Sequence, residues 1–93
     1  MTLKIERISD NRRTRIRLSG GFRVEHIDQV KAEIELCRLT AELDLEEVDL
    51  VDIEAVRFLN SCRSGGIRML HRSTYIRMWM LRERRHPIDR ENI

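Results

Sequence analysis

The fold is decided by residues 41–59, which read AELDLEEVDLVDIEAVRFL. Leucines at 43 and 45 alternate with acidic residues, and this period of two predicts a strand from about Thr40 to Leu45. Residues 48–52 then predict a connecting loop with apolar anchors. Asp52 suits a helix N-cap, because its carboxylate can accept hydrogen bonds from the free amides of a first helical turn.

The apolar spacing after Asp52 predicts a helix that ends at Gly65-Gly66, where a glycine can take the left-handed position after the last turn. Upstream, residues 3–8 and 14–18 alternate and predict two strands. Residues 9–12 are turn-forming, so these strands form a hairpin. We expect Gly20-Gly21 to break the second strand, and residues 25–38 to form a helix.

Downstream, residues 67–70 predict a short strand, and Ser73 or Thr74 can cap a last helix that Pro87 makes unlikely to continue. The order is β-β-α-β-α-β-α. We therefore expect an α/β fold with a mixed sheet of about four strands and helices packed mainly on one face. Residues 1–85 would form one domain and residues 86–93 a C-terminal tail.

Composition excludes several classes of protein. The chain has 93 residues, which is too few for a large multi-layer enzyme, and no apolar run approaches the length of a membrane span. We expect no signal peptide. The net charge of +2 conceals basic outer segments (1–23 and 64–93) around an acidic segment, 24–63. Cys37 and Cys62 fit neither a disulfide framework nor a zinc site, so we expect buried free thiols in a reducing cytosol.

No catalytic constellation is evident in the chain. The serines lack a nucleophile motif, and His26, His71 and His86 are scattered. The carboxylates Asp44, Asp49 and Asp52 could indicate acid–base chemistry or a metal, but loop solubility and helix capping explain them more simply. We therefore expect no enzyme activity, no metal and no cofactor.

Nucleic-acid binding is a weaker alternative. It is favoured by two groups of arginines and opposed by the scarcity of aromatic residues for base stacking. The arginines are Arg12, Arg13, Arg15 and Arg17 in the hairpin, and Arg82, Arg84 and Arg85 in the last helix.

Over about residues 3–83 the chain resembles a STAS domain, a family named for sulfate transporters and anti-sigma-factor antagonists. Asp44 matches the family's strand-end aspartate, and Asp52 matches the aspartate that precedes its phosphorylated serine. Residues 65–68 resemble the family's glycine turn into the next strand. The chain departs from the family at the switch: Ile53 replaces the serine and Ala55 replaces the glycine. The Arg-rich helix end and short tail also replace the family's last strand and helix.

The resemblance implies a bacterial, cytoplasmic regulatory module of signalling and transcription control. Such modules bind a protein partner without catalysis. Phosphoryl transfer to position 53 would be impossible, since isoleucine has no hydroxyl, so regulation would be independent of phosphorylation there. The degenerate switch loop is Asp52, Ile53, Glu54 and Ala55. The expected partner-binding residues are Asp49, Leu50, Val51, Asp52, Ile53, Glu54, Val56 and Arg57.

Two interpretations of Ile53 are open. It could pack inside a decayed switch, or it could be an exposed apolar contact surrounded by acidic residues, as is usual in protein interfaces. The partner would be an anti-sigma-factor or kinase-like protein. An alternative is a subunit of a lipid or anion transport complex, and homodimerisation is also open. We expect neither nucleic-acid binding nor direct membrane insertion.

Overall fold

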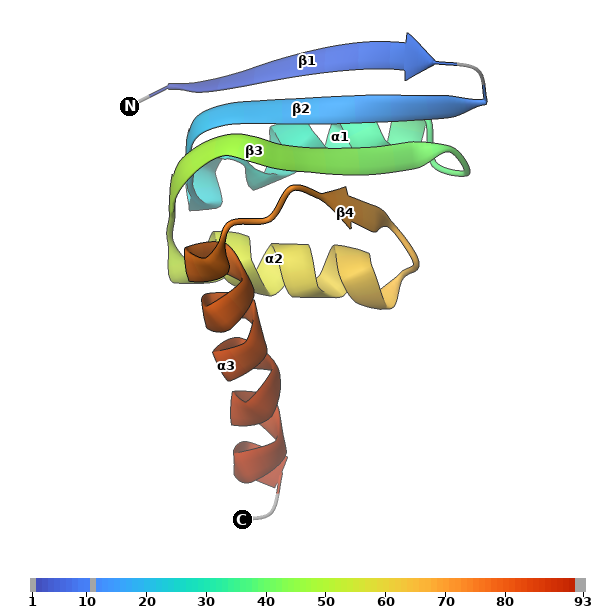
Figure 1. The fold of residues 1–93 in the computed structure, drawn as a ribbon. Helices are drawn as coiled ribbons and strands as arrows, with labels where there is room; N and C mark the ends of the chain where they lie inside the picture. Colours follow the sequence, from blue (N-terminus) through green and yellow to red (C-terminus); the bar gives the residue numbers. More distant parts are fainter. Residues whose placement is uncertain (1, 11, 92–93) are drawn as a thin grey trace.

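The chain folds into a four-stranded mixed sheet with three α-helices, as the sequence predicts (Figure 1). The computed structural model describes residues 2–10 and 12–91, with side chains up to Arg84. Asn11, part of the predicted turn, and residues 92–93 of the predicted tail lie outside this range. The elements are β1 (Leu3–Asp10), β2 (Arg13–Phe22), the 3-10 helix η1 (Val24–His26), α1 (Ile27–Leu36), β3 (Ala41–Val51), α2 (Ile53–Ser64), β4 (Arg68–Leu70) and α3 (Thr74–Glu91).

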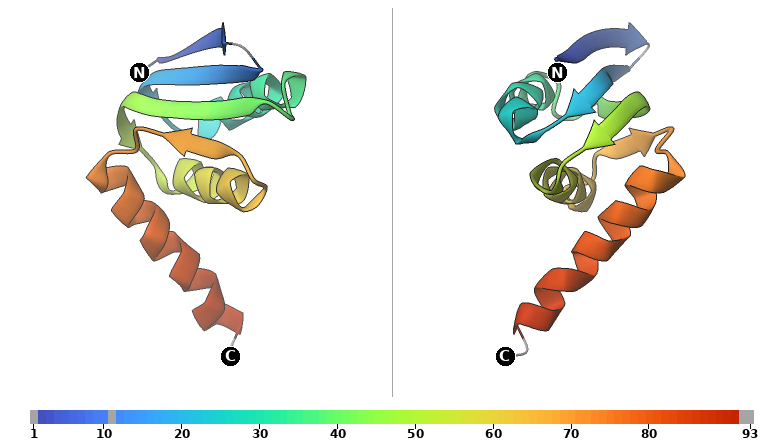
Figure 2. Two further views of the ribbon diagram at one scale, coloured as in Figure 1. Left: turned by 45° about the vertical axis from the view of Figure 1, so that its right-hand side comes forward. Right: turned by 90° about the vertical axis from the view of Figure 1, so that its left-hand side faces the viewer.

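The strands lie in the order β1-β2-β3-β4. The hairpin pair β1–β2 is antiparallel, whereas β2–β3 and β3–β4 are parallel, because a helix connects the strands of each parallel pair. The helices α1 and α2 lie on the same face of the sheet (Figure 2). Fully buried residues of β2 and β3, such as Ile16 and Leu43, form the core together with the apolar sides of these helices.

Strand β2 continues through the glycine pair, so the prediction that Gly20-Gly21 breaks it is wrong. The strand runs to Phe22, and its pairing with β3 shifts register between Arg17 and Ser19 and again between Gly20 and Gly21. Gly20 has a positive φ of 98°. An irregularity of this kind lets a strand bend while its pairing continues, and a glycine makes it sterically accessible.

Strand β3 is also longer than predicted, because residues 48–51 are strand and not loop. The long β2 gives them a partner: Val48 pairs with Gly20, and Val51 with Phe22. Val48 and Val51 are buried. Asp44 therefore lies in the middle of β3 and not at its end.

The ends of α2 and α3 follow the capping prediction in part. Gly66, just after α2, has a φ of 92°, and the Ser73 hydroxyl accepts a hydrogen bond from the Ile76 amide at 3.2 Å. The prediction that the last helix stops at Pro87 is wrong, since α3 extends to Glu91. A proline removes one amide donor, but its fixed φ is itself a helical value. No helix in the described part of the chain is long and apolar enough to span a membrane.

Helix α3 packs against α2 near its start and then projects away from the sheet (Figures 1 and 2). Ile76 and Met80 are buried in this contact. The Asn60 side chain donates a hydrogen bond to the Met80 carbonyl at 2.9 Å, and Arg57 Nε lies 3.0 Å from the buried carboxylate of Glu83. Apolar burial, a hydrogen bond and an ion pair thus fix the first turns of α3.

The cysteines are both free, but only one is buried as predicted. Burial raises the pKa of the Cys62 thiol to about 11, so the thiol stays protonated at neutral pH. Cys37, at the end of α1, is half-buried.

We expect Gly20→Ala to lower the free energy of unfolding by more than Gly66→Ala. A positive φ costs any L-residue about 1–2 kcal/mol at either site. A Cβ at position 20 would in addition lie 2.9 Å from the Thr2 carbonyl oxygen, whereas nothing lies within 4 Å of one at position 66. Urea unfolding of both variants measures the difference, and equal losses would contradict the proposed close approach.

Candidate functional site

Asp52 joins the ends of β2 and β3 to the helices that follow them. Its Oδ1 accepts a hydrogen bond from the Ala55 amide at 2.9 Å, which caps α2 as predicted. Its Oδ2 accepts a second bond from the Val24 amide at 2.8 Å, at the start of η1. One carboxylate therefore holds two helix starts together, and both present free amides to it.

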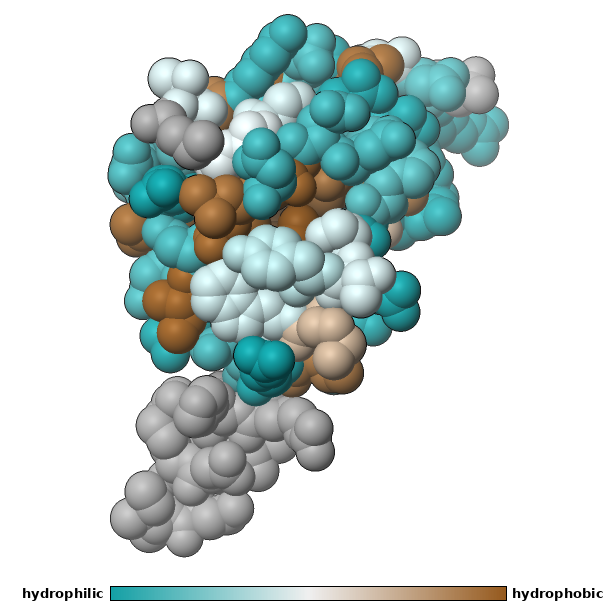
Figure 3. Space-filling model, turned by 60° about the vertical axis from the view of Figure 1, so that its left-hand side comes forward, coloured by the Kyte–Doolittle hydropathy of each residue, from teal (hydrophilic) through white to brown (hydrophobic). Residues whose placement is uncertain are grey.

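Two exposed apolar side chains lie beside this carboxylate. Ile53 opens α2 and is 40% exposed, and Val24 opens η1 and is 53% exposed. Ile53 is therefore not a core residue, which argues against its packing inside a decayed switch, while its contact with a partner stays a prediction. The end of the sheet that carries both residues faces the viewer in Figure 3, where small hydrophobic patches lie among hydrophilic side chains.

Carboxylates lie close to these two residues in the sequence. Glu25 and Glu54 follow them directly and are exposed, as is Asp49 near the end of β3. We call Val24, Glu25, Asp49, Ile53 and Glu54 the α2-start surface. Such an arrangement, with an apolar centre and a charged rim, has the usual composition of a protein-binding surface.

The other predicted partner-binding residues lie elsewhere. Val51 and Val56 are buried in the core, so their side chains support the α2-start surface but cannot contact a partner. Ala55, predicted only as part of the degenerate switch loop, is also buried. Leu50 is half-buried. Arg57 bridges Glu54 at 3.4 Å and Glu83 at 3.0 Å, and it therefore helps to fix α3.

Sequence reasoning missed Val24 as a site residue. It identified the acidic segment and Ile53, but Val24 is 28 residues away from Asp52 along the chain. The only local signal was an apolar residue at the point where strand periodicity ends.

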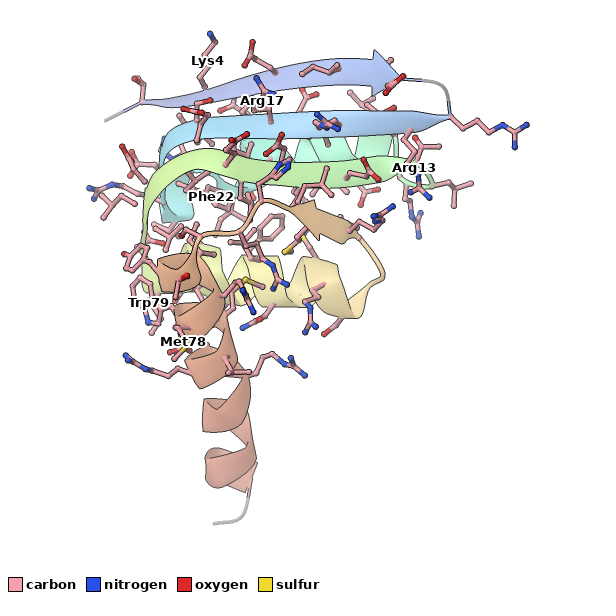
Figure 4. All side chains as sticks on the ribbon, in the orientation of Figure 1. Lys4, Arg13, Arg17, Phe22, Met78 and Trp79 are labelled. Atoms are coloured by element: carbon pink, nitrogen blue, oxygen red, sulfur yellow. The ribbon has the colours of Figure 1, made fainter. Side chains whose placement is uncertain are left out.

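A second cluster surrounds Asp44 on the helix-free face of the sheet. This aspartate is fully buried, with Arg17 Nε at 3.7 Å and Arg15 Nη1 at 4.0 Å from its Oδ2. Its Oδ1 accepts from the Glu46 amide at 3.0 Å and lies 3.2 Å from His71 Nδ1. Figure 4 shows Arg13 and Arg17 extending from β2. Asp44 is therefore neither a loop residue nor a helix cap, so the prediction that loop solubility or capping explains this carboxylate is wrong.

The environment of Asp44 favours its charged form. Burial opposes ionisation, but the Glu46 amide, the hydrogen bond and charge of His71 and the charge of Arg17 outweigh it, so the pKa of Asp44 is lowered. His71 reaches this position with a φ of 59°, a conformation that histidine tolerates better than most residues.

The chemistry available to this cluster is limited. Ligand atoms of Asp44, Glu46 and His71 lie within 4.8 Å of one another, which is close enough for a metal ion. The guanidinium groups of Arg15 and Arg17 oppose a cation there, because they already neutralise Asp44. Among the described residues, no hydroxyl or thiol is hydrogen-bonded to His71, so an activated nucleophile is not formed.

Comparison with known proteins adds no family assignment. No protein-family model matches the chain, and no curated protein matches it.

We expect Asp52→Ala to lower the free energy of unfolding by about 1–2 kcal/mol, the upper range for loss of a helix cap, because two hydrogen bonds are lost. Asp49→Ala is the matched control, since Asp49 is exposed and forms no ion pair among the described residues. Thermal and urea unfolding measure both variants. If the two lose the same stability, the carboxylate of Asp52 does not hold the helix starts.

We expect Asp44→Asn to cost about 1–3 kcal/mol at pH 7, the usual cost of an unsatisfied buried polar group. The pKa of Asp44 is lower in the folded chain than the value of about 3.9 in an unfolded one. Its stabilisation is therefore complete above about pH 5 and disappears as the pH falls through the folded-state pKa. Urea unfolding between pH 7 and pH 2 should show a smaller acid-induced loss in this variant than in the wild type. If Asp44→Asn lost as much stability on acidification as the wild type, the lowered pKa of Asp44 would be contradicted.

Proposed function

We propose that the chain is a non-catalytic regulatory module that binds a protein partner through the α2-start surface. The observation that supports this most directly is the exposed Ile53 on the first turn of a firmly capped helix. A rigid apolar side chain loses little conformational freedom on binding, which favours affinity. The STAS-like order of motifs and elements adds support, and with it we propose a cytoplasmic, anti-sigma-factor-antagonist type of role.

The carboxylates of this surface indicate the chemistry of the partner. Glu25, Asp49 and Glu54 are exposed. Among the residues whose side chains are described, Glu54 pairs with Arg57 at 3.4 Å, Glu25 lies 4.0 Å from His26 Nε2, and Asp49 has no ion pair. A partner with lysine or arginine side chains around an apolar pocket would complement this surface and be steered to it. An anti-sigma-factor or kinase-like protein is our first candidate.

Regulation by phosphate at position 53 has no place in this proposal. Isoleucine cannot accept a phosphoryl group, and Glu54 supplies a fixed negative charge next to it. We therefore propose that partner binding is not regulated by phosphorylation at position 53.

We expect Ile53→Asp to weaken partner binding by about thirtyfold or more, the effect of losing an interface residue worth about 2 kcal/mol. Stability should fall by no more than about 2 kcal/mol, because Ile53 is 40% exposed and an aspartate suits the first turn of a helix. Leu39→Asp is the control: Leu39 is 97% exposed and precedes β3, whereas Ile53 follows it. The wild type, Ile53→Asp and Leu39→Asp are compared first by affinity capture from native lysate and then by titration with the purified partner.

The identity of the captured protein separates the candidate functions. A sigma-regulating kinase supports transcription control, whereas a membrane transport ATPase supports the alternative of a transport-complex subunit. Equal capture by all three chains would contradict a role for Ile53. Phosphorylation by the bound kinase that alters binding would contradict regulation independent of phosphate, if it occurs on Ser61, Ser64, Ser73 or Thr74.

A further inference from the structure

A basic cavity lies between α2 and α3, away from the α2-start surface. Its volume is about 250 Å³, whereas a single water molecule requires only about 10–15 Å³. Met78, Met80 and Leu81 form its apolar lining, and Figure 4 shows Met78 beside Trp79 on α3. Its polar lining consists of Asn60, Arg63, Arg72, Thr74, Arg77 and Arg84.

The arginines of this cavity differ from those of the sheet. Five arginines on the strands each have a carboxylate oxygen within 4.0 Å: Arg7, Arg13, Arg15, Arg17 and Arg68. In contrast, the four arginines of the cavity form no ion pair with any residue whose side chain is described. Arg72 is half-buried, whereas Arg63, Arg77 and Arg84 are exposed. Solvent therefore screens part of their mutual repulsion, and an anionic ligand would remove the rest.

The surroundings of Arg72 show how close these charges are. Burial, Arg63 and Arg77 together lower the pKa of Arg72, so the positive charge of all three is concentrated in one place. The start of α3 adds to it, because the first turn of this helix holds no acidic residue. The first turns of α1 and α2 each hold one, Asp28 and Glu54, to offset the positive end of the helix dipole.

One further polar atom at the cavity lacks a partner. Asn60 Oδ1 is buried and accepts no hydrogen bond among the described residues, while its Nδ2 is bonded to Met80. A buried acceptor without a donor is unfavourable, and a ligand with a hydroxyl or a protonated oxygen could satisfy it.

We propose that this cavity binds a phosphate group of a small molecule or of a lipid headgroup. Arginine is suited to this ligand because its planar guanidinium donates two parallel hydrogen bonds to phosphate oxygens. The methionines and Leu81 would contact the apolar part of the same ligand. This site does not depend on the proposed protein-binding role.

The test is titration of the intact chain with inorganic pyrophosphate. Binding is monitored by calorimetry and by NMR of the arginine side chains. We expect saturable binding that weakens with added salt, with shifts at Arg63, Arg72 and Arg77. Arg72→Gln and Arg77→Gln should each weaken binding by about tenfold or more, the effect of losing a charge-assisted hydrogen bond. Arg38→Gln, which removes an exposed charge beyond α1, should bind like the wild type, and circular dichroism checks that every variant is folded.

Vesicles of phosphatidylcholine with and without phosphatidic acid distinguish the source of the phosphate. Arg72-dependent binding to the acidic vesicles but not to pyrophosphate would assign the site to a lipid headgroup, whereas binding of free pyrophosphate would assign it to a soluble ligand. Two results would overturn the proposal: no binding to either probe, or equal binding by the Arg72, Arg77 and Arg38 variants. Ile53→Asp should bind pyrophosphate normally, so this proposal and the protein-binding proposal can fail separately.

Discussion

The arrangement of the structure depends on the carboxylate of Asp52. Parallel strands end at the same edge of a sheet, so the segments that leave β2 and β3 begin side by side with unpaired amides. Asp52 accepts from both, from Val24 at 2.8 Å and from Ala55 at 2.9 Å. A charged acceptor forms stronger hydrogen bonds than a neutral one. The same carboxylate therefore orients α2, sets where η1 begins, and brings Val24 and Ile53 together at the surface.

Charge is distributed differently on the two faces of the sheet. The face under α1 and α2 is apolar, whereas on the helix-free face arginines of β2 pair with the buried carboxylates Glu42 and Asp44 of β3. Arg68 from β4 also pairs with Glu42, at 3.4 Å. A buried carboxylate is tolerated only when it is paired and hydrogen-bonded. These ion pairs explain why a strand rich in acidic residues can occupy the centre of a sheet.

The two proposed sites lie on different parts of α2 and have opposite charge. Its first turn contributes the exposed Glu54 to the proposed protein-binding surface, and its last turn contributes Arg63 to the proposed phosphate-binding cavity. Both sites are consistent with a binding protein and require no catalytic group.

The sequence by itself determined the α/β class, the order of elements and the cap at Asp52, because these depend on periodicity and on local backbone chemistry. It left open whether Ile53 is buried or exposed, and it did not show that Val51 and Val56 are buried. It could not determine where β2 and β3 end. Residues 48–51 are strand only because β2 continues past Gly20 to pair with them. The tertiary structure also decided that Asp44 is buried beside His71, that Val24 joins Ile53, and that arginines from α2, the loop after β4 and α3 surround one cavity. In each case the partners are far apart along the chain, and only packing brings them within the few ångströms over which hydrogen bonds and paired charges act.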